Sequence, residues 1–208
     1  MEFRNEIVQY GGINVNLGLP ITTNVDRSVH AGVELSSSRN IGRDFKLTGN
    51  FSTTYNRIKK FQVTEAVYDN DQNYNLVGYQ QVNYDGHTIA GFPSYLGNLI
   101  GEYFNDHWRL TYRGRLVGRT YVEDDNREDL SIPPFFTSSV SAELALGKML
   151  NIGNLSFALR VDNILDKRYE ASGYGGVTRF RDITNQYWAE YIPAAERSFF
   201  STLKLELK

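Results

Sequence analysis

Cysteine is absent from the 208-residue sequence, which excludes a disulfide-stapled scaffold, a thiolate nucleophile and a thiolate metal site. No run of about 18 consecutive apolar residues occurs, so a helical membrane protein is excluded as well. Neither charge predominates, because 22 Lys and Arg residues stand against 24 Asp and Glu residues, and this balance does not favour nucleic acid as a partner. The three histidines are not spaced as metal ligands on one element, so we expect neither a metal nor a cofactor.

A secretory signal is also missing from the start of the sequence. Residues 1–8 look like the middle of a strand, with no basic n-region and no apolar h-region before them. An exported protein needs such a signal. We therefore favour an internal piece of a longer exported chain over a protein that is not exported.

The sequence does contain a sustained alternation of apolar and polar residues. It runs through residues 155–162 and again through residues 199–207. A period of two is typical of β-strands that have one apolar and one polar face. The apolar face would pack on a second sheet in a soluble sandwich, or meet lipid in an outer-membrane barrel whose polar face lines a wet lumen. The side chains predicted to face the membrane are Leu144, Leu159, Val161, Leu203 and Leu205.

About eight strands follow from this pattern, and their connections alternate in length. We expect strands at about 1–9, 29–37, 45–55, 93–103, 108–121, 135–146, 155–162 and 197–207. Long loops are expected at about 11–28, 57–92, 122–134 and 166–193, and short turns at about 40–44, 105–107 and 147–154. Transmembrane barrels combine short periplasmic turns with long extracellular loops and carry aromatic girdles at both interfaces. We therefore predict an all-β, antiparallel up-and-down transmembrane β-barrel.

Two C-terminal motifs resemble those of TonB-dependent outer-membrane receptors. Val161-Asp-Asn-Ile-Leu-Asp-Lys-Arg-Tyr resembles a signature near the end of these receptors, and Tyr191-Ile-Pro-Ala-Ala-Glu-Arg-Ser-Phe-Phe resembles the entry to their last strand. The chain departs from the family in two places. Ala194-Ala-Glu stands where a Gly often precedes the Arg, and the chain ends on Lys208 where many members end on an aromatic residue.

The resemblance implies a large plugged barrel of the roughly 22-stranded type, with residues 1–208 as the C-terminal part of its barrel domain and the plug domain absent. It implies active uptake of a scarce ligand, of the ferric siderophore, cobalamin or glycan class, and no enzymatic activity. The implied partners are outer-membrane lipid, the plug domain and remaining barrel strands, a TonB-type energy transducer and the barrel-assembly machinery. Two alternatives stay open: a self-contained small outer-membrane barrel with a structural or adhesion role, and a membrane-embedded hydrolase.

Four arginines share one face of the predicted strand at 108–121. They are Arg109, Arg113, Arg115 and Arg119. They could line the lumen and attract an anionic or metal-chelate ligand, or dock acidic groups of a plug. We expect instead that they form ordinary interstrand ion pairs with Glu143, Asp162, Glu102 or Glu206.

Aromatic and acidic residues of the long loops complete the set of candidates. Tyr74, Tyr79, Tyr187 and Trp188 could form a ligand-capture surface on the loops, or could pack loop against loop, and the sequence favours neither. Acidic residues 124–129 lack the spacing of a calcium loop, so we expect a solvated loop. Gly173-Tyr-Gly-Gly is expected to be a turn within a loop.

Overall fold

The computed structural model describes residues 1–14, 19–149 and 153–207, most of which lie in β-strands. The strands are β1 (Glu2–Asn14), β2 (Leu19–Ile41), β3 (Phe45–Lys60), β4 (Gln62–Tyr68), β5 (Leu76–Asn83), β6 (Tyr95–Phe104), β7 (Trp108–Val117), β8 (Phe135–Met149), β9 (Gly153–Asp162), β10 (Glu170–Phe180), β11 (Gln186–Pro193) and β12 (Ser198–Leu207). A single 3-10 turn, η1 (Glu128–Leu130), occurs within the described ranges. No helix in these ranges is long and apolar enough to cross a membrane.

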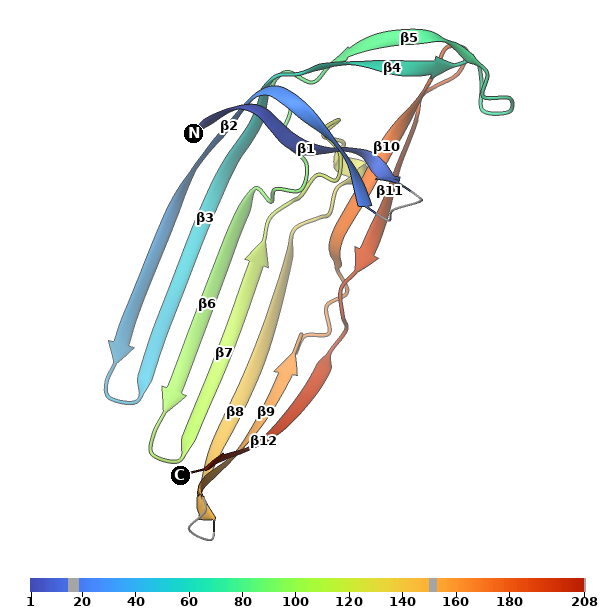
Figure 1. The fold of residues 1–208 in the computed structure, drawn as a ribbon. Helices are drawn as coiled ribbons and strands as arrows, with labels where there is room; N and C mark the ends of the chain where they lie inside the picture. The colour runs from blue at the N-terminus through green and yellow to red at the C-terminus, as the bar shows by residue number, and fades with distance from the viewer. Residues whose placement is uncertain (15–18, 150–152, 208) are drawn as a thin grey trace.

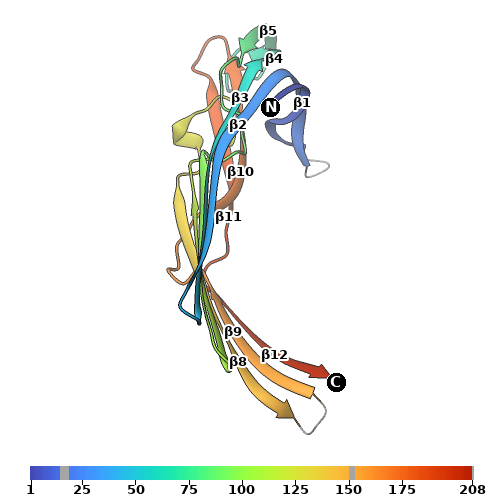
Figure 2. The same ribbon diagram turned by 90° about the vertical axis from the view of Figure 1, so that its left-hand side faces the viewer.

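Eight of the strands form one antiparallel sheet in the order β1-β2-β3-β6-β7-β8-β9-β12. They correspond to the eight strands predicted from the alternation, and the predicted up-and-down meander is confirmed. The β2–β3, β6–β7 and β8–β9 turns lie at one end of the sheet and the long connections at the other (Figure 1). Seen from the side, the sheet is curved (Figure 2). Strands β1 and β12 are its two edges, so the described residues form an open part of a barrel wall.

Two of the expected loops contain a second sheet, and the prediction of irregular loops at 57–92 and 166–193 is wrong. Strands β4 and β5 pair as an antiparallel hairpin, as do β10 and β11, and a short parallel contact between β10 and β4 joins the hairpins in the order β11-β10-β4-β5. The Gly173-Tyr-Gly-Gly segment lies within β10 and not in a turn. Strand β5 is largely exposed on both faces, so its sequence lacks the apolar alternation that reveals a half-buried strand.

Two other connections are shorter than expected. Strand β1 continues to Asn14 and β2 begins at Leu19, so most of the expected loop at 11–28 is strand, and residues 15–18 lie outside the described ranges. Strands β8 and β9 pair up to Met149 and Gly153, so most of the expected turn at 147–154 is strand as well. Residues 150–152 of that turn also lie outside the described ranges.

One face of the eight-stranded sheet carries the apolar side chains. Cα pairing aligns Leu144, Phe157 and Leu203 in one row across β8, β9 and β12. Leu159 and Leu203 are 43% and 67% exposed, so the described residues place no second sheet on this face and the sandwich interpretation is wrong for them. Strands β6 and β7 have 10 residues each, which is the length that a tilted strand needs to cross the hydrocarbon layer.

Aromatic rings cover glycines on this apolar face. A Cβ atom at Gly114 would lie 3.1 Å from ring atoms of Phe136 on the neighbouring strand, and a Cβ atom at Gly97 would lie 3.4 Å from the ring of Phe51. Because glycine has no side chain, the ring can lie flat over the neighbouring backbone. Such cross-strand pairs stabilise one register of the sheet over its alternatives.

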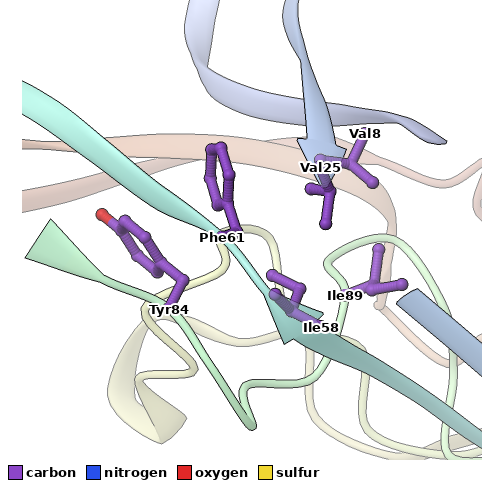
Figure 3. Close-up of a cluster of buried hydrophobic side chains, with 6 residues drawn as sticks. All are labelled: Val8, Val25, Ile58, Phe61, Tyr84 and Ile89. Carbon is purple, nitrogen blue, oxygen red and sulfur yellow. The ribbon is translucent and has the colours of Figure 1, made fainter. Parts of the chain in front are cut away.

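The buried apolar core lies at the long-connection end of the sheet. It consists of Val8, Val25, Ile58, Phe61, Tyr84 and Ile89 (Figure 3). These residues come from β1, β2, β3, the β3–β4 junction and the segment that follows β5. Several of these residues fall in the stretches expected to be polar loops. The core therefore fixes the long connections to the barrel wall, while the wall itself is one layer thick.

Candidate ligand-binding face

Strand β7 places arginines on the sheet face opposite the apolar one. Arg109, Arg113 and Arg115 are exposed and alternate with the apolar side chains of the strand. None of these three forms an ion pair with a described residue. The expected interstrand pairs are therefore wrong.

The acids expected to neutralise these arginines are engaged elsewhere or stand alone. Asp162 pairs with Arg160 of its own strand at 3.1 Å, and Glu206 pairs with Lys204. In both cases the partner lies two residues away on the same face of the same strand. Glu143 lies opposite Arg109 and Glu102 lies opposite Thr111 in the strand pairing, but neither acid forms an ion pair with a described residue.

Arg119 differs from the other three arginines. Its Nη1 donates to the Ser131 hydroxyl at 2.6 Å and to the Glu128 carbonyl at 3.2 Å, and its Nη2 lies 4.0 Å from the Glu128 carboxylate. Arg119 therefore ties the η1 turn to the end of β7. Arg119 is thus bonded to residues of its own loop, unlike Arg109, Arg113 and Arg115.

Two adjoining cavities lie on the arginine-bearing face. The first has a volume of about 520 Å³ and includes Asn50, Asn98, Arg113 and Arg115 in its lining. The second, of about 450 Å³, is more aromatic and includes Tyr121, Phe135 and Arg115.

Arg115, Thr137 and Tyr169 line both cavities. The rings of Phe135 and Tyr169 stack with a centroid distance of 4.3 Å and an interplanar angle of 25°. The acids of the first cavity are Asp162 and Glu196, and both are paired, Glu196 with Arg168 at 3.1 Å. The two unpaired guanidinium groups therefore make this face attractive to anions.

The four aromatic candidates do not form one surface. Tyr79 lies on β5 and Tyr187 and Trp188 on β11, at opposite edges of the second sheet. Tyr79 is 68% exposed and makes no ring contact with a described residue, whereas Tyr74 contacts the rings of Tyr68 and Phe180.

Tyr187 and Trp188 have packing partners within the second sheet and its neighbouring loop. The guanidinium group of Arg127 lies 4.4 Å from the ring centroid of Tyr187. A Cβ atom at Gly176 would lie 3.0 Å from the Trp188 ring, which therefore covers this glycine of β10. Tyr74, Tyr187 and Trp188 thus have packing partners, but Tyr74 and Trp188 remain 48% and 39% exposed, so a role of these residues in ligand capture stays a prediction.

A buried polar network that the sequence does not reveal joins four segments of the chain above the wall. The Glu65 carboxylate accepts hydrogen bonds from the hydroxyls of Tyr10 (2.6 Å) and Tyr84 (2.7 Å) and pairs with the Arg179 guanidinium. Arg179 and Glu65 have side-chain exposures of only 8% and 11%, and Arg179 also lies 3.9 Å from Asp125. Because Glu65 and Arg179 are 114 residues apart, no local motif could have indicated the pair.

The pKa directions follow from this burial. Burial by itself would raise the pKa of Glu65, but the hydrogen bonds from Arg179, Tyr10 and Tyr84 outweigh it and hold the pKa below its usual range. Burial, together with the hydrogen bond to Glu65, raises the pKa of the Tyr10 and Tyr84 hydroxyls. The network therefore contains an ionised carboxylate and two neutral phenols at neutral pH.

Asp124 is buried, so the expectation of a solvated acidic loop is wrong at this residue. Its side chain is 1% exposed, and its Oδ1 accepts the Ala90 N–H at 2.8 Å while its Oδ2 has no hydrogen-bond partner among the described residues. Burial, with the neighbouring Asp125 charge, raises the pKa of this carboxyl to about 7 against the opposing hydrogen bond from Ala90. The long connection between β7 and β8 thus holds an acid that titrates near neutral pH.

The signature segment between β9 and β10 forms a clamp on the start of β12. The Asn163 side-chain amide donates to the carbonyls of Lys167 (2.9 Å) and Ala195 (3.3 Å), and its Oδ1 accepts the Lys167 N–H. The Asp166 carboxylate accepts the Arg197 N–H at 3.0 Å. The side chains of Asn163 and Asp166 therefore hold the two C-terminal motifs, residues 161–169 and 191–200, against each other. This role is structural.

Comparison with known proteins gives one family. The family model described as TonB dependent receptor-like, beta-barrel, matches residues 1–164. A search of curated proteins finds no match. Among solved structures, the siderophore receptor PiuA from Acinetobacter baumannii matches with a TM-score of 0.63 and 16% identity, over 97% of this chain and 24% of that chain.

Two further structures match in the same way. The copper transporter OprC has a TM-score of 0.60 and 14% identity, over 97% of this chain and 26% of its own. The ferric-catecholate import receptor Fiu from Escherichia coli K12 has a TM-score of 0.57 and 18% identity, over 97% of this chain and 23% of its own. At these identities the similarity shows the fold alone. The chain spans about a quarter of the length of the solved structures that it matches.

Proposed function

Because the chain belongs to the TonB-dependent receptor-like β-barrel family, we propose that residues 1–208 are the C-terminal part of the barrel wall of an active-transport receptor. Members of this family are outer-membrane transport receptors, and the chain is located in the outer membrane. The proposed activity is uptake of a scarce ligand of the ferric siderophore, cobalamin or glycan class. The chain carries out no reaction of its own, and the energy comes from a periplasmic TonB-type partner.

The observation that carries the ligand part of this proposal is the pair of unpaired arginines beside the two cavities. Arg113 and Arg115 are exposed and form no ion pair with a described residue, so their positive charge would attract an anionic partner into the lumen. An anionic or metal-chelate ligand is such a partner. Arg109, nearer the short-turn end, would instead meet acidic groups of a plug domain.

The apolar face supports the membrane part of the proposal. Its rows of Leu, Val and aromatic side chains would meet lipid, while the arginine-bearing face lines the lumen. In these rows Leu159, Leu203 and Leu205 are exposed and Leu144 and Val161 are half-buried. The plug domain and the remaining strands would complete the lumen, and edges β1 and β12 would pair with those strands. The barrel-assembly machinery would insert the whole receptor.

The alternative of a self-contained small barrel is less well supported. Such a barrel requires its first and last strands to pair, whereas β1 and β12 lie at opposite edges of the sheet and no described pairing joins them. Uptake is therefore the function to test first.

The test is ligand uptake by cells that carry or lack the gene, with radiolabelled ferric siderophores, cobalamin and glycans as probes. We expect uptake of at least one probe to depend on the gene and to stop when an uncoupler collapses the proton gradient. We also expect Arg115→Ala to raise the half-saturating concentration at least about tenfold, because a hydrogen bond to a charged group contributes about 1.5–3 kcal/mol.

The matched control is Arg39→Ala, which removes an exposed arginine at the short-turn end of the apolar face. This variant should transport like the wild type. Uptake that is independent of the gene, or that persists without a proton gradient, would refute the transport function. Normal uptake by Arg115→Ala would refute the role of this arginine only.

A further inference from the structure

A third cavity lies between strands β4 and β10 of the second sheet. It has a volume of about 370 Å³, and its lining comes mainly from residues 63–66 of β4 and 176–179 of β10. The rings of Tyr10, Tyr68 and Tyr84 complete one part of the lining. Among the described residues, this cavity shares no lining residue with the two arginine-bearing cavities. It is therefore a separate candidate binding site.

The cavity opens where the pairing of β4 with β10 stops. Within the described ranges the two strands pair in parallel at two positions, Val67 with Arg179 and Tyr68 with Phe180. From this contact the strands diverge, as Figure 1 shows. Two residues before the contact, at Val177, the ladder has already ended, and the edges of two strands face each other across a gap.

The backbone of Val177 faces this gap. The Arg181 N–H donates to the Tyr68 carbonyl at 2.8 Å, so the backbone groups of Arg181 point towards β4. Alternate residues of a strand direct their backbone groups to the same side, so those of Val177 point towards β4 as well. Strand β11 pairs on the other side of β10. The N–H and C=O of Val177 therefore have no strand partner in the described ranges.

The backbone of Thr64 faces the same gap from the side of β4. The Phe61 carbonyl accepts the Tyr84 N–H at 3.0 Å, so the backbone groups of Phe61 point to the β5 side. Thr64 is three residues further along, and its backbone groups therefore point away from β5 and towards β10. An unpaired strand edge is a template on which another extended chain can pair.

The remaining lining restricts the kind of chain that fits. Its charged side chains are Glu65, Glu123 and Arg179, and the first and last of these pair with each other. With two acids and one base, the cavity does not attract anions as the arginines of β7 do. Its volume is near the lower end of the range of about 300–1,000 Å³ that is typical of small-molecule sites, which suits a short peptide and not a long strand of another protein.

We propose that this cavity binds a short peptide, uncharged or basic, in an extended conformation. The peptide adds as a strand to the free edge of β10 at Val177, and Thr64 of β4 faces its other side. In such strand addition, main-chain hydrogen bonds give affinity and pockets for side chains give specificity. The inference goes beyond the proposed uptake function, because none of the three proposed ligand classes is a peptide.

The test uses the whole receptor purified in detergent and an equimolar pool of end-capped tetrapeptides in which all four positions vary. Peptides retained by the receptor are identified by mass spectrometry. Hydrogen exchange of the receptor is then measured with and without the most enriched peptide. We expect exchange of the Val177 amide to slow at least about tenfold, because a hydrogen-bonded amide exchanges only when its bond opens.

Val177→Pro removes the N–H that faces the gap, and proline is tolerated at an edge position whose N–H is outside the ladder. We expect this variant to lower retention of the enriched peptide at least about fivefold, the effect of one lost hydrogen bond. The matched control is Gln81→Pro on the outer edge of β5. Because the Tyr84 N–H points to β4, that of Gln81, three residues earlier, points away from it. This control should retain the peptide like the wild type.

A pool from which no peptide is retained would overturn the proposal, as would a peptide that the wild type and Val177→Pro retain equally. Protection at Arg113 or Arg115 in place of Val177 would assign the peptide to the arginine-bearing cavities and would overturn it too. If Val177→Pro fails to assemble, the wild type decides: a copy of the enriched peptide with N-methylated amides cannot pair as a strand, and equal retention of both peptides refutes the proposal. Because uptake is not measured, a failure of the proposed transport function would not change this result.

Discussion

At the scale of single residues, Asp124 and Arg115 show how the same lack of a partner has different consequences in different surroundings. The Asp124 carboxylate is fully buried, with one oxygen unpartnered, so its charged form is disfavoured. Arg115 is exposed in the open wall and lines two cavities, so its charge is available to a ligand. The first residue makes stability depend on pH, and the second is proposed to contribute to ligand affinity.

The pH dependence has a definite sign. The pKa of Asp124 rises from 3.8 to about 7 in the folded loop, so the folded state binds this proton more tightly than the unfolded state. Its contribution to stability is present at low pH and is lost as the pH rises from about 4 to about 7. Asp124→Asn keeps an acceptor for the Ala90 N–H and has no charge to bury.

We therefore expect Asp124→Asn to protect residues 86–91 from amide exchange relative to the wild type at pH 8 and much less so at pH 4.5. The difference between these conditions is on the order of 3 kcal/mol, since one pKa unit corresponds to about 1.4 kcal/mol. Hydrogen exchange compared between variant and wild type at each pH measures it. Asp71→Asn, at an exposed acid of the β4–β5 turn, is the control and should change nothing. Equal protection of the wild type and Asp124→Asn at pH 8 would contradict the assignment.

Residue contacts were the least predictable part of the molecule. The sequence identified Arg109, Arg113, Arg115 and Arg119 as one set, but the pairing of Arg119 with the η1 turn depends on how a loop folds back. The Glu65–Arg179 pair depends on two hairpins meeting edge to edge. Neither arrangement has a local pattern, because each joins segments that are distant in the sequence.

At the scale of elements, the alternation of apolar and polar side chains decides how each strand sits in the membrane. Strand β12 shows it well: Leu203 pairs opposite Phe157 on the apolar face, and its neighbour Thr202 points to the other face. Because the side chains of a strand alternate between the two faces of the sheet, two adjacent residues lie in different environments. One residue therefore serves as the control for the next.

We expect Leu203→Arg to lower the free energy of unfolding in lipid vesicles by about 2–4 kcal/mol, because it places a charge on the lipid face near the middle of a membrane-spanning strand. Thr202→Arg places the same charge on the lumen face and should have little effect. Denaturant titration of both variants measures the difference. If Leu203→Arg and Thr202→Arg unfold alike, the two faces do not have the environments assigned to them.

Strands of the barrel wall were predictable from the sequence, and strands of the second sheet were not. The eight wall strands each have one apolar face, which leaves a period of two in the sequence. Strands β4, β5, β10 and β11 lie above the wall, where no lipid selects an apolar face. Strand β10 in addition contains Gly173, Gly175 and Gly176, which resemble a turn, although at Gly176 the missing side chain makes room for Trp188.

At the scale of the whole molecule, the described residues form a curved, one-layer wall with a small folded cap at its long-connection end. Its core is confined to that cap, around Ile58 and Tyr84 (Figure 3). The wall alone buries little apolar surface. Its stability therefore depends on the lipid or protein that covers its two faces. In the proposed receptor, lipid covers one face, and a plug and a ligand cover the other.

The central claim is that the apolar face meets lipid and the arginine-bearing face meets the aqueous lumen. This stretch of chain has no cysteine, so Leu144→Cys, Leu159→Cys and Leu203→Cys each introduce one labelling site into it, with Thr202→Cys and Ser156→Cys as controls on the other face. Spin labels at the three leucine positions of the receptor in lipid vesicles should be quenched strongly by oxygen and weakly by a water-soluble nickel chelate, and the control positions should show the reverse order. Labels at Leu144, Leu159 and Leu203 that neither quencher reaches would mean that protein covers this face, and that result would contradict the claim.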